Sequence, residues 1–118
     1  MASPATESFV QDLLGIAPGF RPEYEEHLAD NDQLLPHVLL GDFTRWLRAR
    51  VADGDSATVG TVLGFLESSY AAGDEDVQEL ISVSFLENLI GESELDELRP
   101  QLGPELSKAL EALETFSP

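Results

Sequence analysis

Apolar residues in this chain recur every three or four positions, in segments of helical length, and Gly or Pro separates each segment from the next. This spacing places apolar side chains along one side of an α-helix. No comparable stretch alternates with the two-residue period of a strand. The sequence therefore predicts an all-α protein. The clearest apolar stripe follows the turn DGDS and consists of Val59, Val62, Leu63, Leu66 and Tyr70.

Turn and capping residues set the boundaries of the expected helices. Gly73 suits the left-handed end of one helix, and Asp74 suits the N-cap of the next. Because short links leave successive helices adjacent, about six or seven helices should pack as antiparallel hairpins, in one or two layers or as a short solenoid-like stack. The expected helices are 6–16, Pro22 to the DND motif, 35 or 36 to 52, one after Asp55 or Ser56, 75–90, one in ESELDELRPQL, and one after Pro104 with the stripe Leu106, Ala109, Leu110, Leu113 and Phe116.

The third of these helices contains Gly41, and a glycine in a helix interior costs about 1 kcal/mol relative to alanine. Gly41 predicts either a close helix crossing or a short break between Leu40 and Asp42. The apolar stripe of this helix also leaves one choice open, since either Trp46 or Leu47 can face the core.

Length and composition indicate a single helical domain over 1–118. Of the 118 residues, 42% are hydrophobic, which is enough for one ordinary core. The chain has no cysteine, so disulfides and thiolate metal sites are excluded. No segment reaches the roughly 20 apolar residues that span a bilayer. The start MASPATESFV lacks the features of a secretory signal, and we expect a cytoplasmic protein without membrane contact.

Charge is the strongest compositional signal. The chain has 23 acidic residues against 6 Lys and Arg, which gives a formal net charge of −17. Such a surface repels nucleic acid and anionic membranes, and it favours fast encounter with a basic protein. Solubility alone is the simpler explanation of the charge. The acidic residues expected to contact a partner are Glu25, Glu26, Asp30, Asp32, Glu75, Asp76, Glu79 and Glu87, on one shared face or on two separate faces.

The sequence contains no complete catalytic or metal-binding signature. His27 and His37 stand on either side of an expected helix break, and the HExxH spacing of zinc enzymes is absent. The segment that begins DND lacks the central glycine and the final glutamate of a calcium loop. No serine lies in a GxSxG motif. We therefore expect a protein that is not an enzyme and has no metal ion or cofactor.

Three stretches resemble a family of small, acidic, all-helical bacterial proteins of unassigned function. They are RPEYEEHLADNDQLLPHVLLGDFTRWL, DVQELISVSFLENL and LGPEL. The size and the charge also resemble those of immunity proteins, which neutralise polymorphic bacterial toxins. The family pattern implies no catalytic residues. The matching positions are Pro22, Tyr24, His27, Leu28, Asp30, Asn31, Leu34–His37, Gly41, Asp42 and Ser84–Leu89.

The matching positions around LLPH and GD combine apolar and polar residues where two helices meet. Buried polar side chains need hydrogen-bond partners, so this region predicts an internal polar network between the second and third helices. A partner or ligand site there is the alternative, since aromatic residues beside charges are typical of interfaces. The residues of the predicted network are Tyr24, His27, His37, Asp42, Arg45 and Trp46.

Three hypotheses of function follow. The first is an immunity-like inhibitor that binds a cationic toxin or nuclease through its acidic surface, with mimicry of nucleic acid as a special case. The second is a small ligand-binding or enzymatic domain that uses His27, His37 and Asp42. The third is a helical adaptor that associates with itself. The oligomeric state stays open at this stage.

Overall fold

The computed structural model describes residues 3–116 and contains helices and no strand within that range. The predicted all-α fold is confirmed. The segments α5, η2 and α6 follow one another without a break, so the described chain has seven helices. The elements are α1 (Pro4–Ile16), the 3₁₀ turn η1 (Pro18–Phe20), α2 (Arg21–Asn31), α3 (Pro36–Ala52), α4 (Ser56–Ala71), α5 (Glu75–Ile81), the π-helical segment η2 (Ser82–Leu86), α6 (Glu87–Leu89), α7 (Leu95–Leu98), the 3₁₀ turn η3 (Arg99–Gln101) and α8 (Pro104–Phe116).

Side-chain caps explain where the helices begin. Asp55 accepts a hydrogen bond from the Thr58 N–H at 3.2 Å, and Asp74 accepts one from the Val77 N–H at 3.1 Å. Asp74 is the predicted cap, and of the two predicted candidates Asp55 and Ser56 it is Asp55 that acts as the cap. The first helix begins earlier than predicted, because Ser3 accepts from the Thr6 N–H at 3.2 Å and so acts as its N-cap.

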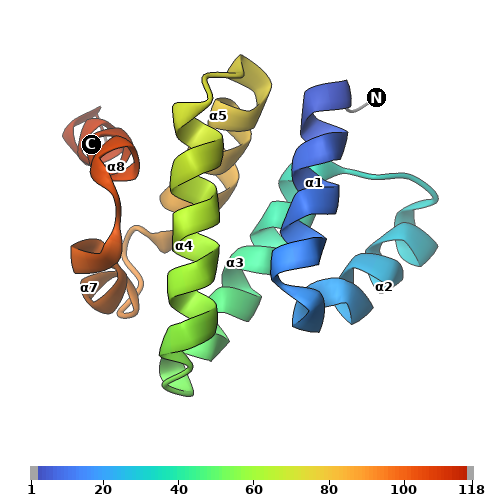
Figure 1. Cartoon of the computed structure of the whole chain (residues 1–118), viewed down its shortest axis with the longest axis horizontal. Coiled ribbons are helices and arrows are strands. Elements are labelled where there is room, and N and C mark those ends of the chain that lie inside the picture. Colours follow the sequence, from blue (N-terminus) through green and yellow to red (C-terminus); the bar gives the residue numbers. More distant parts are fainter. Residues whose placement is uncertain (1–2, 117–118) are drawn as a thin grey trace.

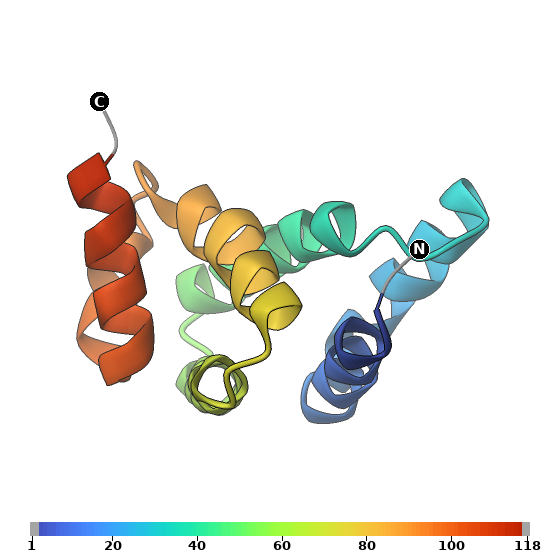
Figure 2. The same ribbon diagram turned by 90° about the horizontal axis from the view of Figure 1, so that it is seen from above.

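The core lies where α3 meets the continuous helix formed by α5, η2 and α6. In Figure 1, α1 and α4 lie side by side, and α3 crosses behind them. Seen from above, α8 stands at the opposite end from α1 and α2 (Figure 2). Phe43 and Leu47 from α3, and Phe85 and Leu86 from η2, are completely buried in this core. None of the described helices has the length and apolar character needed to cross a membrane.

The third helix answers two questions that the sequence left open. It runs through Gly41, so the break predicted as one alternative is absent, and a Cβ atom at this position would lie 3.8 Å from the Asn88 amide nitrogen, an ordinary contact. The packing here therefore does not require a glycine. Leu47 is buried in the core, whereas Trp46 is only partly buried at its edge.

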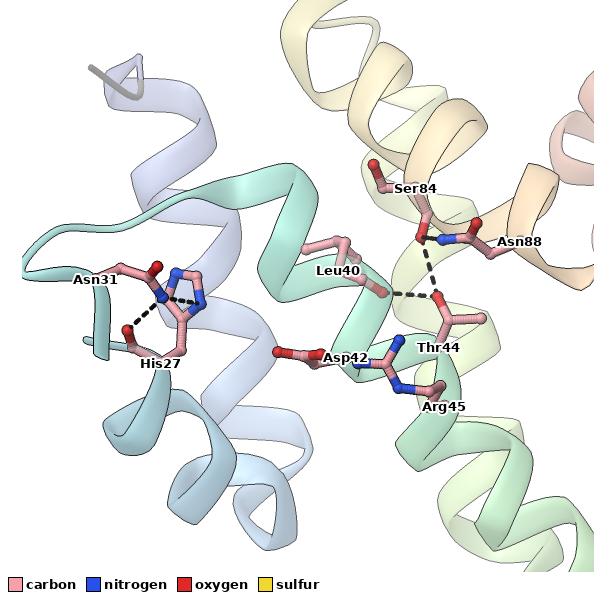
Figure 3. A network of polar contacts seen from close by, with 8 residues as sticks. All are labelled: His27, Asn31, Leu40, Asp42, Thr44, Arg45, Ser84 and Asn88. Carbon is pink, nitrogen blue, oxygen red and sulfur yellow. Dashed lines mark hydrogen bonds and ion pairs between the residues drawn. The ribbon is translucent and has the colours of Figure 1, made fainter. Parts of the chain in front are cut away.

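The helix expected over 75–90 contains a π-helical segment, which the sequence did not predict. The Glu87 N–H donates to the Ser82 carbonyl, five residues back instead of four. The wider turn allows three consecutive side chains, from Ser84 to Leu86, to be buried. The Ser84 carbonyl accepts hydrogen bonds from the Thr44 hydroxyl at 3.0 Å and from the Asn88 amide at 2.9 Å. Figure 3 shows both bonds, of which the one from Thr44 attaches the segment to α3.

A long-range cap fixes the last helix. The backbone N–H groups of Glu105 and Leu106 donate to the two carboxylate oxygens of Glu67, each at 3.0 Å. Gly103 makes room for this contact, because a Cβ atom there would lie 2.6 Å from Cγ of Glu67. The carboxylate on α4 therefore closes the start of α8, where negative charge also meets the positive end of the helix dipole.

The apolar stripe predicted for this last helix is largely confirmed. Leu106 and Leu110 are buried, and Ala109 and Leu113 are partly buried against the same core. The side chain of Phe116 lies outside the described part of the structure.

Candidate functional site

An open groove of about 660 Å³ separates α2 from α3. Figure 3 looks at its two sides, with His27 and Asn31 on α2 and with Asp42 and Arg45 on α3. Asp42 points across the groove toward α2. The lining residues are Glu23, Glu26, His27, Asp30 and Asn31 from α2, and Val38, Asp42, Arg45, Trp46, Ala49 and Arg50 from α3.

The α2 wall of the groove is acidic. Glu23, Glu26 and Asp30 are three or four positions apart, so they share one face of the helix. All three are exposed, and none forms an ion pair with another described residue. Of the acids predicted for this helix, Glu25 and Asp32 are not among the lining residues.

The α3 wall contains the only tryptophan of the chain. Trp46 stacks on Phe43 at a centroid distance of 5.5 Å and packs against Phe20 at 5.8 Å. The Arg50 guanidinium group lies over the indole ring of Trp46, 5.4 Å from the ring centroid. The same group donates a hydrogen bond to Asp53 at 3.0 Å. The indole is therefore held firmly at the groove. Val38 adds apolar surface to this wall and is 51% exposed.

His27 connects the groove to the loop that follows α2. Its ring is buried, and Nε2 accepts a hydrogen bond from the Leu35 N–H at 3.0 Å. The Asn31 amide donates to the His27 carbonyl at 2.8 Å. Asp32 then ends the helix in the left-handed conformation, at φ 60°. The bond between Leu35 and His27 therefore holds the loop 32–35 against α2.

His37 lies in a second, smaller groove of about 410 Å³, together with Asp76 and Glu79 of α5. Its Nδ1 is 2.6 Å from the Ser84 hydroxyl, a contact between residues 47 positions apart. The sequence analysis did not predict this contact between His37 and Ser84. Ser84 is only 5% exposed, so its hydroxyl is not presented to solvent as a nucleophile would be. The contact instead ties the start of α3 to the π-helical segment.

The predicted network does not form one connected set of hydrogen bonds. Tyr24 accepts from the Gln11 amide at 3.2 Å, Asp42 pairs with Arg45 on the same helix, and His27 has no direct bond to His37. The network fails because α2 and α3 enclose a groove where the prediction assumed direct packing. The groove does bring together His27 and Asp42, two of the three residues of the ligand-binding hypothesis.

The acidic residues predicted to contact a partner do not lie together on one surface. Glu26 and Asp30 line the first groove, and Asp76 and Glu79 line the second. Neither Glu75 nor Glu87 lines either groove. Within residues 3–116, no group of three or more His, Asp and Glu side chains is arranged to hold a metal ion.

Five of the six basic residues form ion pairs, and three of these, Arg48, Arg99 and Lys108, lie outside the first groove. Arg48 contacts Glu92 and donates to Glu94 at 2.6 Å, which joins α3 to the loop before α7. The hydrogen bond raises the pKa of Arg48 and lowers the pKa of Glu94. Arg99 and Glu114 form a similar pair at 2.8 Å, and their hydrogen bond raises the pKa of Arg99 and lowers that of Glu114. Most carboxylates therefore have no basic neighbour.

The fold and the groove together define a small helical protein with an acid-walled surface site. Residues 10–117 match the family described as Domain of unknown function (DUF7674), and the chain belongs to that family. This membership agrees with the predicted resemblance to a family of unassigned function. No curated protein and no solved structure matches the chain.

Proposed function

We propose that this protein is a non-catalytic binding protein that receives a basic protein partner in the α2–α3 groove. In its specific form, the proposal is an immunity-like inhibitor of a cationic toxin or nuclease. The observation that supports it is the α2 wall, where Glu23, Glu26 and Asp30 lie on one face and form no ion pair with another described residue, since Arg45 and Arg50 on the opposite wall pair with Asp42 and Asp53.

Electrostatics favours such a partner. Neighbouring carboxylates on one face repel each other, and Lys or Arg side chains of a partner would relieve this repulsion. The net charge of −17 would also speed the encounter with a cationic protein. Exposed charges interact weakly beyond the Debye length of about 10 Å at 0.1 M salt, so binding should weaken as salt rises.

The α3 wall supplies the other half of an interface. Trp46 is rigidly supported by Phe20 and Phe43, and Val38 exposes apolar surface beside it. Buried aromatic anchors account for much of the binding energy in protein interfaces, whereas charges at the rim mainly set the rate of association. The groove therefore combines an acidic α2 wall, which attracts a basic partner, with an aromatic side chain, Trp46, against which the partner can pack.

The test compares two matched triple variants as bait in a pull-down from a lysate of the source organism. The groove variant is Glu23→Gln/Glu26→Gln/Asp30→Asn, and the control variant is Glu75→Gln/Asp76→Asn/Glu79→Gln. Both remove the same charges from exposed helical positions, so they differ in location alone. We expect a basic protein that binds the wild type and the control, elutes with rising salt, and is lost with the groove variant. Equal retention by the two variants would contradict the proposed site.

The specific form of the proposal needs a functional assay. A captured nuclease or toxin should lose its activity on addition of the wild-type protein, and the groove variant should inhibit it at least tenfold more weakly. A captured partner that keeps full activity in the saturated complex would rule out the inhibitor.

A further inference from the structure

The hydrogen bond from the Leu35 N–H determines which nitrogen of His27 carries the proton. The bond uses the lone pair of Nε2 at 3.0 Å. A neutral imidazole has one acceptor nitrogen and one N–H donor. Nδ1 must therefore carry the hydrogen, and it needs an acceptor.

Asn31 does not supply that acceptor. Its amide nitrogen lies 3.4 Å from His27 Nδ1, the contact that Figure 3 draws as a dashed line. The same nitrogen donates to the His27 carbonyl at 2.8 Å, which fixes the orientation of the amide. The contact at Nδ1 therefore joins two donors. His27 is 4% exposed and lines the groove, and the contacts of its ring within residues 3–116 include no acceptor for the Nδ1–H.

A second donor in the groove is also without a partner. The Nε atom of Arg50 is buried and has no hydrogen-bond partner among the described residues, although the same guanidinium group reaches Asp53. A buried donor left unsatisfied is unfavourable. An acceptor from outside the chain would satisfy these donors, and beside His27 the acidic α2 wall would repel one that carries negative charge.

We propose that the occupant of the groove is a Lys- or Arg-containing peptide segment, whose neutral backbone carbonyl accepts the His27 Nδ1–H while its side chains meet Glu23, Glu26 and Asp30. This inference rests on the proposed function and adds a second requirement to it. A simple polyamine satisfies the carboxylates but leaves the His27 donor unpaired. A basic peptide satisfies both.

The experiment uses the wild-type protein and two probes with the same charge. Acetyl-Lys-Lys-Lys-amide has three amines and several carbonyls, and spermidine has three amines and no carbonyl. Trp46 fluorescence reports occupancy of the groove, since it is the only tryptophan. Long-range ¹H–¹⁵N spectra report the tautomer and the hydrogen bonding of His27. His37 serves as the internal control, because it is the other histidine of the chain and lines the second groove.

We expect the free protein to show the Nδ1–H tautomer of His27. Both probes should change the Trp46 emission, but the peptide alone should shift the His27 Nδ1–H resonance, and His37 should stay unchanged. An Nε2–H tautomer in the free protein would overturn the inference. A change at Trp46 without any shift at His27 for either probe would also overturn it, and would leave the acidic groove intact as a cation site. No change at Trp46 with either probe would remove the proposed groove function as well.

Discussion

Replacing Glu67 by alanine should destabilise the protein by removing the cap of α8. Both carboxylate oxygens accept backbone N–H groups at 3.0 Å, from Glu105 and Leu106. Loss of a helix cap costs about 0.5–2 kcal/mol, and loss of a charge at the helix N-terminus costs about 0.3–1 kcal/mol. Because two donors lose their partner, we expect about 1–2 kcal/mol. For a domain of this size, that lowers the melting temperature by about 4–8 °C.

The measurement is thermal and urea denaturation of Glu67→Ala beside Glu79→Ala. Glu79 is exposed on α5 and has no hydrogen bond or ion pair within the described chain, so its replacement removes the same charge without a cap. The control matters because any loss of an acid relieves repulsion in a protein with a net charge of −17. The reasoning is refuted if Glu67→Ala is as stable as Glu79→Ala.

A double-mutant cycle tests the same contact from the opposite side. Alanine at Gly103 would place a Cβ atom 2.6 Å from Cγ of Glu67, so the carboxylate has to move away from α8. Gly103→Ala should therefore destabilise the wild type and cost less in the Glu67→Ala background, with a coupling energy of about 0.5–1 kcal/mol. Additive effects would show that the two residues do not share the cap.

Three further predictions concern other contacts. Thr44→Val should cost about 1 kcal/mol in urea denaturation, because it removes a buried hydroxyl whose single hydrogen is shared between the Leu40 and Ser84 carbonyls; an unchanged midpoint would contradict this. Glu94 has a lowered pKa in the folded protein, so its contribution to stability is present above its unfolded pKa and is lost as the pH falls through the folded value. Glu94→Gln should accordingly be less stable than the wild type at pH 7 and equally stable near pH 2, and a difference that persists at the lower pH would refute the ion pair as its origin. Finally, raising NaCl from 20 to 500 mM should raise the melting temperature by screening repulsion, and a fall would show that ion pairs dominate.

Local chemistry predicted the helix boundaries well. Asp55 and Asp74 act as the N-caps that the sequence indicated, and Gly73 has the expected positive φ, at 89°. These features depend on residues within one turn of each other, so they are visible in the order of the amino acids. The apolar period likewise predicted which face of each long helix is buried.

Contacts between distant residues could not be predicted in this way. The cap from Glu67 to α8 and the pair of His37 with Ser84 join separate helices, and nothing in the local pattern distinguishes Glu67 from the other acids. The π-helical segment depends on a partner too, because Thr44 on α3 satisfies the Ser84 carbonyl. The groove could not be predicted as such for a related reason. The sequence named most of its lining residues and kept a partner or ligand site there as the alternative, but its main interpretation was a polar network that packs α2 against α3.

The short loop 32–35 contributes to the lining of the second groove and is bonded to a residue that lines the first. Its backbone is fastened to His27 on the side of the first groove, while Leu34, Leu35 and Pro36 line the second. A ligand of the second groove that displaced Leu35 would also break its N–H bond to His27, a residue that lines the first groove. If such a ligand changed the affinity of the first groove through this bond, linkage would make the influence equal in both directions.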